Sequence, residues 1–198
     1  MTETAELEYK LIGEIVTEGS SVLDLGCGSG DLMSRLIEKK NVRAQGIEID
    51  DDAIYKCVAR GLSVFHGDLD TGLSDYGDKS FDYVILNQSI QQVKKPDAVL
   101  NEAFRVGKNV IVGFPNFAQI KARFRMFFLG RVPITPSLPF DWHDTPNLHF
   151  LSILDFTDYC RRSGITIVKS YFIGKKRPVR IFPNLFAHTA IFLIKKIK

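Results

Sequence analysis

The sequence has few cysteines, one tryptophan and no long apolar run, and these shortages exclude whole classes of protein. Three cysteines among 198 residues cannot all pair, and they show no metal-ligand spacing, so reduced thiols in a reducing cytosol are expected. No apolar stretch approaches the ~20 residues of a membrane-spanning helix. The polar, acidic start of the chain is unlike a signal or transit peptide. The sequence therefore predicts a cytoplasmic protein without stable membrane insertion.

Several motifs of established chemistry are also missing. There is no His-x-x-x-His or His-Glu-x-x-His metal pattern and no Gly-x-Ser-x-Gly nucleophile elbow. The glycine-rich segment at residues 26–30 is not followed by the lysine of a P-loop. We therefore expect no bound metal, and the sequence identifies no catalytic residue.

Positive charge is unevenly spread although the net charge is only +3. Two basic groups stand out, one of them interleaved with aromatic residues. They comprise Lys121, Arg123, Arg125 and Arg131 among Phe124, Met126, Phe127 and Phe128, and then Lys175, Lys176, Arg177, Arg180, Lys195 and Lys196. Nucleic acid, a membrane surface or an acidic protein would each suit such a patch, and so would a purely solvated face.

Apolar runs alternate with segments of helical periodicity along most of the chain. This alternation predicts βαβ units and a parallel sheet in a single α/β domain. Helices are predicted at 5–17, 31–39, 51–60, 96–105 and 152–163, and strands at 21–25, 42–49, 62–65, 81–86, 110–114, 165–172 and 190–194.

The alternation is interrupted at residues 115–150, which we call the excursion. It holds five of the eight prolines, the only tryptophan and two of the four histidines. Ligands of open α/β sheets bind beyond the carboxyl ends of the strands. We therefore expect the excursion to cover that edge as an inserted lid or interaction segment, with Trp142 within reach of the bound ligand.

A glycine-rich turn between a strand and a helix is the strongest functional signal. Residues 22–30 read Val-Leu-Asp-Leu-Gly-Cys-Gly-Ser-Gly, so a buried strand leads into three glycines. Their Gly-x-Gly-x-Gly spacing differs from the Gly-x-Gly-x-x-Gly of dinucleotide binders. Acidic residues follow the next two strands: Glu48 could accept from a ribose and Asp68 from an adenine amino group.

This arrangement resembles class I S-adenosylmethionine (SAM)-dependent methyltransferases. The resemblance implies a Rossmann-like fold with a seven-stranded, mostly parallel sheet of order 3-2-1-4-5-7-6, strand 7 antiparallel, and helices on both faces. It also implies binding of SAM or S-adenosylhomocysteine (SAH). The residues carried over by motif match are Asp24, Gly26, Gly28, Glu48, Asp68, Leu69 and Asn87.

A catalytic base is harder to assign than the cofactor. Methyl transfer to a prepared nucleophile can be accelerated by positioning alone, and a base is needed only where the acceptor must lose a proton. The segment after the fourth strand reads Ile-Gln-Gln-Val at residues 90–93, where many small-molecule methyltransferases have Leu-Glu-His-Val. The candidates near the cleft are Asn87 and Gln88 and, in the excursion, Asp141, His143 and Asp144. His149 is expected to pack or cap.

A closer resemblance is to the MetW family of methionine biosynthesis proteins. It is carried by motifs over residues 113–117, 130–133, 138–149 and 183–186, and covers nearly the whole chain. The resemblance implies a partner or regulatory role beside homoserine O-acyltransferase. A true methyltransferase acting on a small molecule is the alternative. Nucleic-acid methylation is disfavoured because no Asn-Pro-Pro-Tyr-type signature follows the fourth strand.

Overall fold

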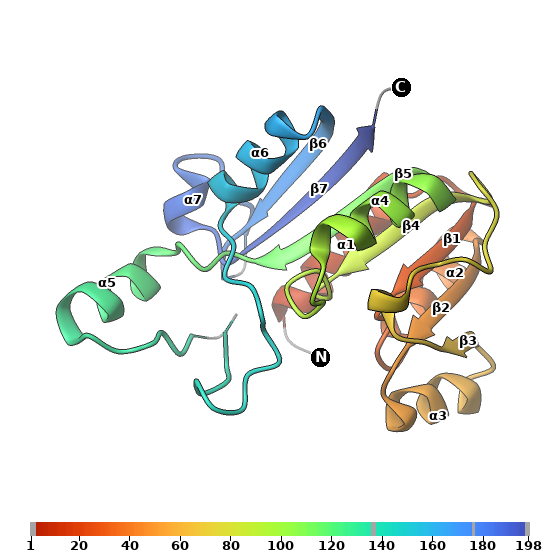
Figure 1. The fold of residues 1–198 in the computed structure, drawn as a ribbon, viewed down its shortest axis with the longest axis horizontal. Helices are drawn as coiled ribbons and strands as arrows, with labels where there is room; N and C mark the ends of the chain where they lie inside the picture. Colours follow the sequence, from red (N-terminus) through yellow and green to blue (C-terminus); the bar gives the residue numbers. More distant parts are fainter. Residues whose placement is uncertain (1–2, 136–137, 176, 197–198) are drawn as a thin grey trace.

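The computed structural model describes residues 3–135, 138–175 and 177–196. Within these ranges the chain forms seven strands, seven α-helices and one short 3-10 helix, η1 (Figure 1). In chain order they are α1 (Glu3–Ile15), β1 (Ser21–Leu25), α2 (Asp31–Lys40), β2 (Arg43–Glu48), α3 (Asp51–Ala59), β3 (Ser63–His66), η1 (Leu69–Thr71), β4 (Phe81–Asn87), α4 (Pro96–Val106), β5 (Gly107–Pro115), α5 (Ile120–Leu129), α6 (Ile153–Arg162), β6 (Ile165–Ile173), α7 (Pro183–Phe186) and β7 (Thr189–Lys196).

The strands form one sheet of order β3-β2-β1-β4-β5-β7-β6. Neighbours from β3 to β5 are parallel, whereas β7 runs antiparallel to both β5 and β6. This confirms the sheet that the methyltransferase resemblance implies. Because β1, β2, β3 and β4 are parallel and adjacent, the loops after them meet at one edge of the sheet.

Both faces of the sheet are covered by helices, as expected. Side chains alternate between the faces along a strand, so the central strands divide their apolar residues between two cores. Val22, Ile85 and Ile111 pack with α1 and α2 on one face. Leu23, Leu86 and Val112 pack with α4 and α6 on the other. All three cysteines are free and buried.

The structure also differs from the sequence-based expectation. The helix α7 lies within the segment expected to be a basic loop. Strand β5 begins at Gly107, three residues before the expected start at residue 110. At this point the Lys79 side chain donates to the carbonyl oxygens of Phe104 and Gly107. β7 extends at both ends beyond the expected residues 190–194, because it pairs with β6 along almost its entire length.

The excursion is largely irregular apart from α5. It starts where Asn116, fully buried, donates from its side chain to the carbonyl oxygens of Asn184 and Ala187. It returns to the domain at Leu148 and His149, which both donate backbone hydrogen bonds to the Gln91 carbonyl. In Figure 1 the excursion extends beyond the carboxyl ends of β4 and β5. Its part at residues 136–137 lies outside the described residues.

Candidate functional site

The turn after β1 has a backbone conformation that favours glycine. Gly26, Gly28 and Gly30 have φ of 77°, 53° and 77°, in the left-handed region. The N–H of Gly26 donates to the Ile47 carbonyl at 2.8 Å, which holds the turn against β2. A Cβ at Gly28 would meet nothing within 4 Å. The backbone at Gly28 is therefore accessible to a ligand.

Glu48, at the end of β2, holds this turn through hydrogen bonds from backbone N–H groups to its carboxylate. Its Oε2 accepts from the Gly28 N–H at 2.7 Å. Its Oε1 accepts from the N–H groups of Ile49 and Asp50 at 2.8 and 3.0 Å. Glu48, which the sequence suggests as an acceptor for ribose hydroxyls, therefore also holds the glycine turn in place. The sequence alone did not indicate this second role.

Asp24 is a buried carboxylate in the strand that leads into the glycine turn. Its side chain makes no hydrogen bond or ion pair within the residues that the structure describes, and only 3% of it is exposed. Burial, together with the nearby Glu48 carboxylate, raises the pKa of Asp24 to about 7. The site therefore holds two carboxylates whose mutual repulsion a cationic ligand would relieve.

Asp68 and Leu69 lie where β3 leads into η1. Asp68 caps η1, because its Oδ1 accepts from the Asp70 N–H at 2.9 Å. Leu69 is half-buried against the core between the sheet and α4. A capping role and a ligand role are compatible for Asp68, since its carboxylate has a second oxygen.

Asn87 ends β4 and faces β5 and α1. A Cβ at its register partner Gly113 would collide with the Asn87 Oδ1, so the glycine makes room for this amide. The Oδ1 is buried without a hydrogen-bond partner among the described residues. The next residue, Gln88, donates from its side-chain Nε2 to the Oε2 of the buried Glu8 on α1 at 3.3 Å.

Sequence reasoning missed the contribution of α1 to this edge of the sheet. Burial raises the pKa of Glu8, against the lowering effect of the polar side chains of Thr189, Gln88 and Asn87 near it. The pKa of Tyr9 is raised to about 12. Burial is the largest cause, and the negative charges of Asp31, Asp24 and Glu8 raise the pKa further. The usable signal was Glu8 itself, an acidic residue one helical turn before the buried Leu11 and Ile12.

Ser89 is a further residue that the sequence did not single out. It is 7% exposed, and its Oγ has no hydrogen-bond partner in the described part of the chain. A Cβ at Gly26 would lie 2.8 Å from the Ser89 Cβ. The segment after β4 therefore packs directly on the glycine turn.

Gln91 has a structural role at the position where related methyltransferase motifs carry a titratable group. It is 2% exposed, and its side chain donates to the Gln88 carbonyl at 2.9 Å. His149, which was expected to pack or cap, lies 3.0 Å through Nε2 from the Val93 carbonyl. Both residues thus anchor the excursion.

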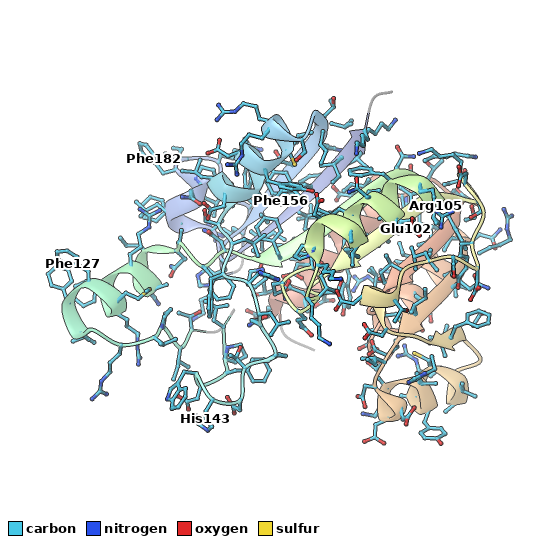
Figure 2. The ribbon with its side chains drawn as sticks, in the orientation of Figure 1. Glu102, Arg105, Phe127, His143, Phe156 and Phe182 are labelled. Carbon is cyan, nitrogen blue, oxygen red and sulfur yellow. The ribbon has the colours of Figure 1, made fainter. Side chains whose placement is uncertain are left out.

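The remaining candidates of the excursion lie on the surface. Trp142, His143 and Asp144 are exposed, with Trp142 at 75%. The rings of Trp142 and His143 meet edge to face at 5.6 Å, and Figure 2 shows His143 at the outer bend of the loop. No group of three or more potential metal ligands occurs within the described ranges. No described helix is long and apolar enough to cross a membrane.

Solved structures share this fold at low sequence identity. One is the putative methyltransferase in a complex with the Trm112 methyltransferase activator of Haloferax volcanii, with a TM-score of 0.72 and 18% identity over 99% of this chain and 90% of that one. Another is a SAM-dependent methyltransferase of Thermotoga maritima, a possible histamine N-methyltransferase, with a TM-score of 0.68 and 18% identity over 98% and 90% of the two chains. At this identity the likeness establishes the fold.

Sequence comparison identifies the family. The bifunctional methionine biosynthesis protein MetXA/MetW of Rhodopirellula baltica is 37% identical over 201 residues, which cover 95% of this chain and 32% of that protein. The chain thus spans about a third of the length of the curated relative it matches. The family profile of the methionine biosynthesis protein MetW matches residues 6–194. Both findings confirm the resemblance drawn from the excursion motifs, and the chain belongs to the MetW family.

Proposed function

We propose that this chain binds SAM or SAH at the carboxyl edge of β1 to β4 and acts in methionine biosynthesis as a partner or regulator of homoserine O-acyltransferase. The observation that carries the partnership is the relative in which a MetW part and a MetXA part share one polypeptide. Fusion holds two proteins at a high effective concentration, which favours parts that work in contact.

The residues at the glycine turn fit a SAM-type ligand. SAM carries an ammonium and a sulfonium, and SAH keeps the ammonium. Asp24 and Glu48 lie close enough for the Glu48 charge to raise the pKa of Asp24. A cationic ligand would offset this repulsion, and the open backbone at Gly28 would let it approach.

Each proposed ligand residue has a distinct task. Asp24 would accept from the ligand's ammonium, Glu48 from the ribose hydroxyls and Asp68 from the adenine amino group. Leu69 would contact the adenine, and Asn87 would face the methionine part. SAM, when bound, supplies an electrophilic methyl group on its sulfonium.

Methyl transfer to a small molecule is the second candidate function, and one observation favours it. Three polar side-chain atoms at or just after the carboxyl end of β4 are buried without hydrogen-bond partners in the described ranges: Asn87 Oδ1, Ser89 Oγ and Gln91 Oε1. Buried polar atoms in native structures are rarely left unpaired. A polar acceptor molecule beside the methionine part would supply partners for them.

One experiment separates the two functions. Homoserine O-acyltransferase of the same organism is assayed alone, with this chain, and with this chain plus SAM or SAH. A change in acyltransferase rate that depends on this chain supports the partner role. No complex and no rate change, together with SAH formation from SAM in a mixture of cellular metabolites, would support the methyltransferase instead.

A further inference from the structure

The helix α5 leaves nearly all of its side chains in solvent. Ala122 is its only buried residue. Five large apolar side chains are more than half exposed: Phe124 (55%), Met126 (59%), Phe127 (82%), Phe128 (65%) and Leu129 (58%). The Phe128 ring contacts both Phe124 and Phe127, at centroid distances of 4.6 and 4.8 Å. The packing of α5 on the domain is thus limited to little more than Ala122.

The segment around α7 extends this apolar surface. Arg123 of α5 donates to the Asn184 carbonyl at 3.5 Å, which places the two helices beside each other. Figure 2 shows Phe127 and Phe182 at the same end of the molecule. We define the α5 face as Phe124, Phe127 and Phe128, which lie on one side of α5 at spacings of three and four residues, together with Ile181 (72%), Phe182 (72%) and Phe186 (48%).

The α5 face is large for a surface that stays in water. At about 200 Å² for a large apolar side chain, its exposed fractions amount to roughly 800 Å². The largest apolar patch of a typical monomer is about 300–600 Å². A stable protein interface buries about 800 Å² on each partner. The face therefore has the area of a complete interface.

Its charge indicates the chemistry of the partner. Residues 116–140 contain Lys121, Arg123, Arg125 and Arg131 and no aspartate or glutamate. Two copies of this chain would bring like charges together, so a second copy is disfavoured. Arginine, phenylalanine and methionine are enriched where proteins meet, whereas lysine is depleted. Three arginines against one lysine favour a protein with acidic residues around an apolar groove over a membrane surface.

A cavity beside α5 offers a place for a side chain of the partner. It has a volume of about 530 Å³ and lies between the helix and the chain that follows it. Its lining residues are Ile120, Lys121, Phe124, Arg125, Ile134 and Thr135. Central anchors of interfaces are large side chains inserted in such pockets.

We propose that the α5 face is the surface that binds homoserine O-acyltransferase, through an apolar groove with an acidic rim on that enzyme. This proposal rests on the proposed function for the identity of the partner. The area, the missing acidic residues and the cavity place the contact on α5 and α7. The site at the glycine turn stays open to its ligand in such a complex.

Phe127→Glu is the test variant, because a side chain that is 82% exposed can be replaced without disturbing the fold. Phe127→Ala tests the loss of apolar area alone. Val58→Glu on α3, at a position that is 60% exposed, is the matched control. Dissociation constants with purified acyltransferase are measured by titration calorimetry. We expect the constant to rise about 30-fold or more for Phe127→Glu, as for a hot-spot residue, and less than about threefold for Val58→Glu. All three variants should keep the thermal shift with SAM.

The outcomes separate the surface from the function. If the wild-type chain does not bind the acyltransferase, the proposed function fails together with the surface. If wild type binds and Phe127→Glu binds equally well, the surface is wrong and the function stands. Capture of wild type, but not of Phe127→Glu, by vesicles of phosphatidylcholine and phosphatidylglycerol, with an unaffected acyltransferase complex, would assign the face to a membrane. A dimer lost in Phe127→Glu by light scattering, with the same unaffected complex, would assign it to a second copy.

Discussion

The backbone carbonyl of Gln91 accepts a hydrogen bond from the backbone N–H of His149 at 3.0 Å. This bond joins the segment after β4 to the end of the excursion. Two residues earlier, Ser89 packs on Gly26 in the glycine turn. One short segment, residues 87–93, therefore contacts both the proposed cofactor site and the excursion. A ligand that shifts this segment has a direct route to the excursion.

Trp142 provides a reporter of that coupling. It is the only tryptophan, and it is 75% exposed. It lines a small cavity together with Phe117, Phe140 and Phe150. We expect SAM to shift its fluorescence to shorter wavelength, because closure of the excursion would shield the indole from water. A steady-state fluorescence titration with SAM measures the shift. An unchanged spectrum at a SAM concentration that saturates the thermal shift would show that the excursion does not respond.

Glu48→Gln should weaken SAM binding by about 10–100-fold, the effect of losing a charged hydrogen-bond acceptor. The amide oxygen can still accept from the Gly28 N–H, but the amide NH2 then faces the N–H groups of Ile49 and Asp50. The turn is therefore weakened less than in Glu48→Ala, and each thermal shift is measured from the variant's own ligand-free melting temperature. Thermal shifts with SAM, SAH and NAD are measured for wild type and variant. The control is Asp52→Asn, which removes one negative charge from the exposed start of α3. A larger shift with NAD than with SAM in the wild type would exclude the proposed cofactor.

Much of the fold was accessible from the sequence because local signals agree with the tertiary structure. The buried strands at 21–25 and 81–86 are apolar runs between turn residues, and the structure has strands there. The glycine turn was identified by a spacing that its positive φ angles explain. The order of the strands came from the family resemblance, since alternation alone fixes only that the sheet is parallel.

The parts that escaped prediction depend on contacts between residues distant in sequence. Glu8 is buried at the site, where it accepts a hydrogen bond from Gln88, 80 positions later, and no local pattern encodes this contact. The short helix α7 is held by Asn116, again far away in the chain. The excursion lacks periodicity outside α5, so its anchoring through Gln91 and His149 required the structure.

Gly26→Ala and Gly28→Ala form a matched pair that separates folding from binding. Both residues have positive φ, which costs alanine about 1–2 kcal/mol. Only at Gly26 would the new Cβ also strike Ser89, at 2.8 Å. We therefore expect Gly26→Ala to lose about 2–4 kcal/mol of unfolding free energy in urea, and Gly28→Ala to lose about half of that.

Ligand binding should rank the same pair differently. Gly28→Ala should fold and still bind SAM poorly, because its methyl group points into the space where the ligand would lie. Calorimetric titration at 10 °C, where both variants are folded, measures this. Wild-type affinity in Gly28→Ala would mean that the cofactor does not lie over the Gly28 backbone.

Asp24 should make stability depend on pH. Its pKa is raised from the ordinary 3.8 to about 7 in the folded chain, so between these values the folded state binds more protons than the unfolded state. The stability that this group contributes is fully present below about pH 4 and is lost as the pH rises through about 7. Asp24→Asn removes the dependence, and at pH 8 it should be more stable than wild type by up to about 4 kcal/mol.

The ligand-free folded chain favours the protonated carboxyl of Asp24, whereas the bound ligand would favour the ionised carboxylate. This opposite dependence on pH makes the test specific. An ammonium beside Asp24 favours the ionised carboxylate, so the thermal shift with SAM should grow from pH 6 to pH 8 in the wild type. In Asp24→Asn the shift should be small and nearly independent of pH, while Asp52→Asn should follow the wild type. Urea denaturation and thermal shifts at pH 5, 6, 7 and 8 measure both quantities on the same samples. If Asp24→Asn gains stability at pH 8 but binds SAM as wild type does, Asp24 is a buried carboxylate of the fold that the ligand does not contact.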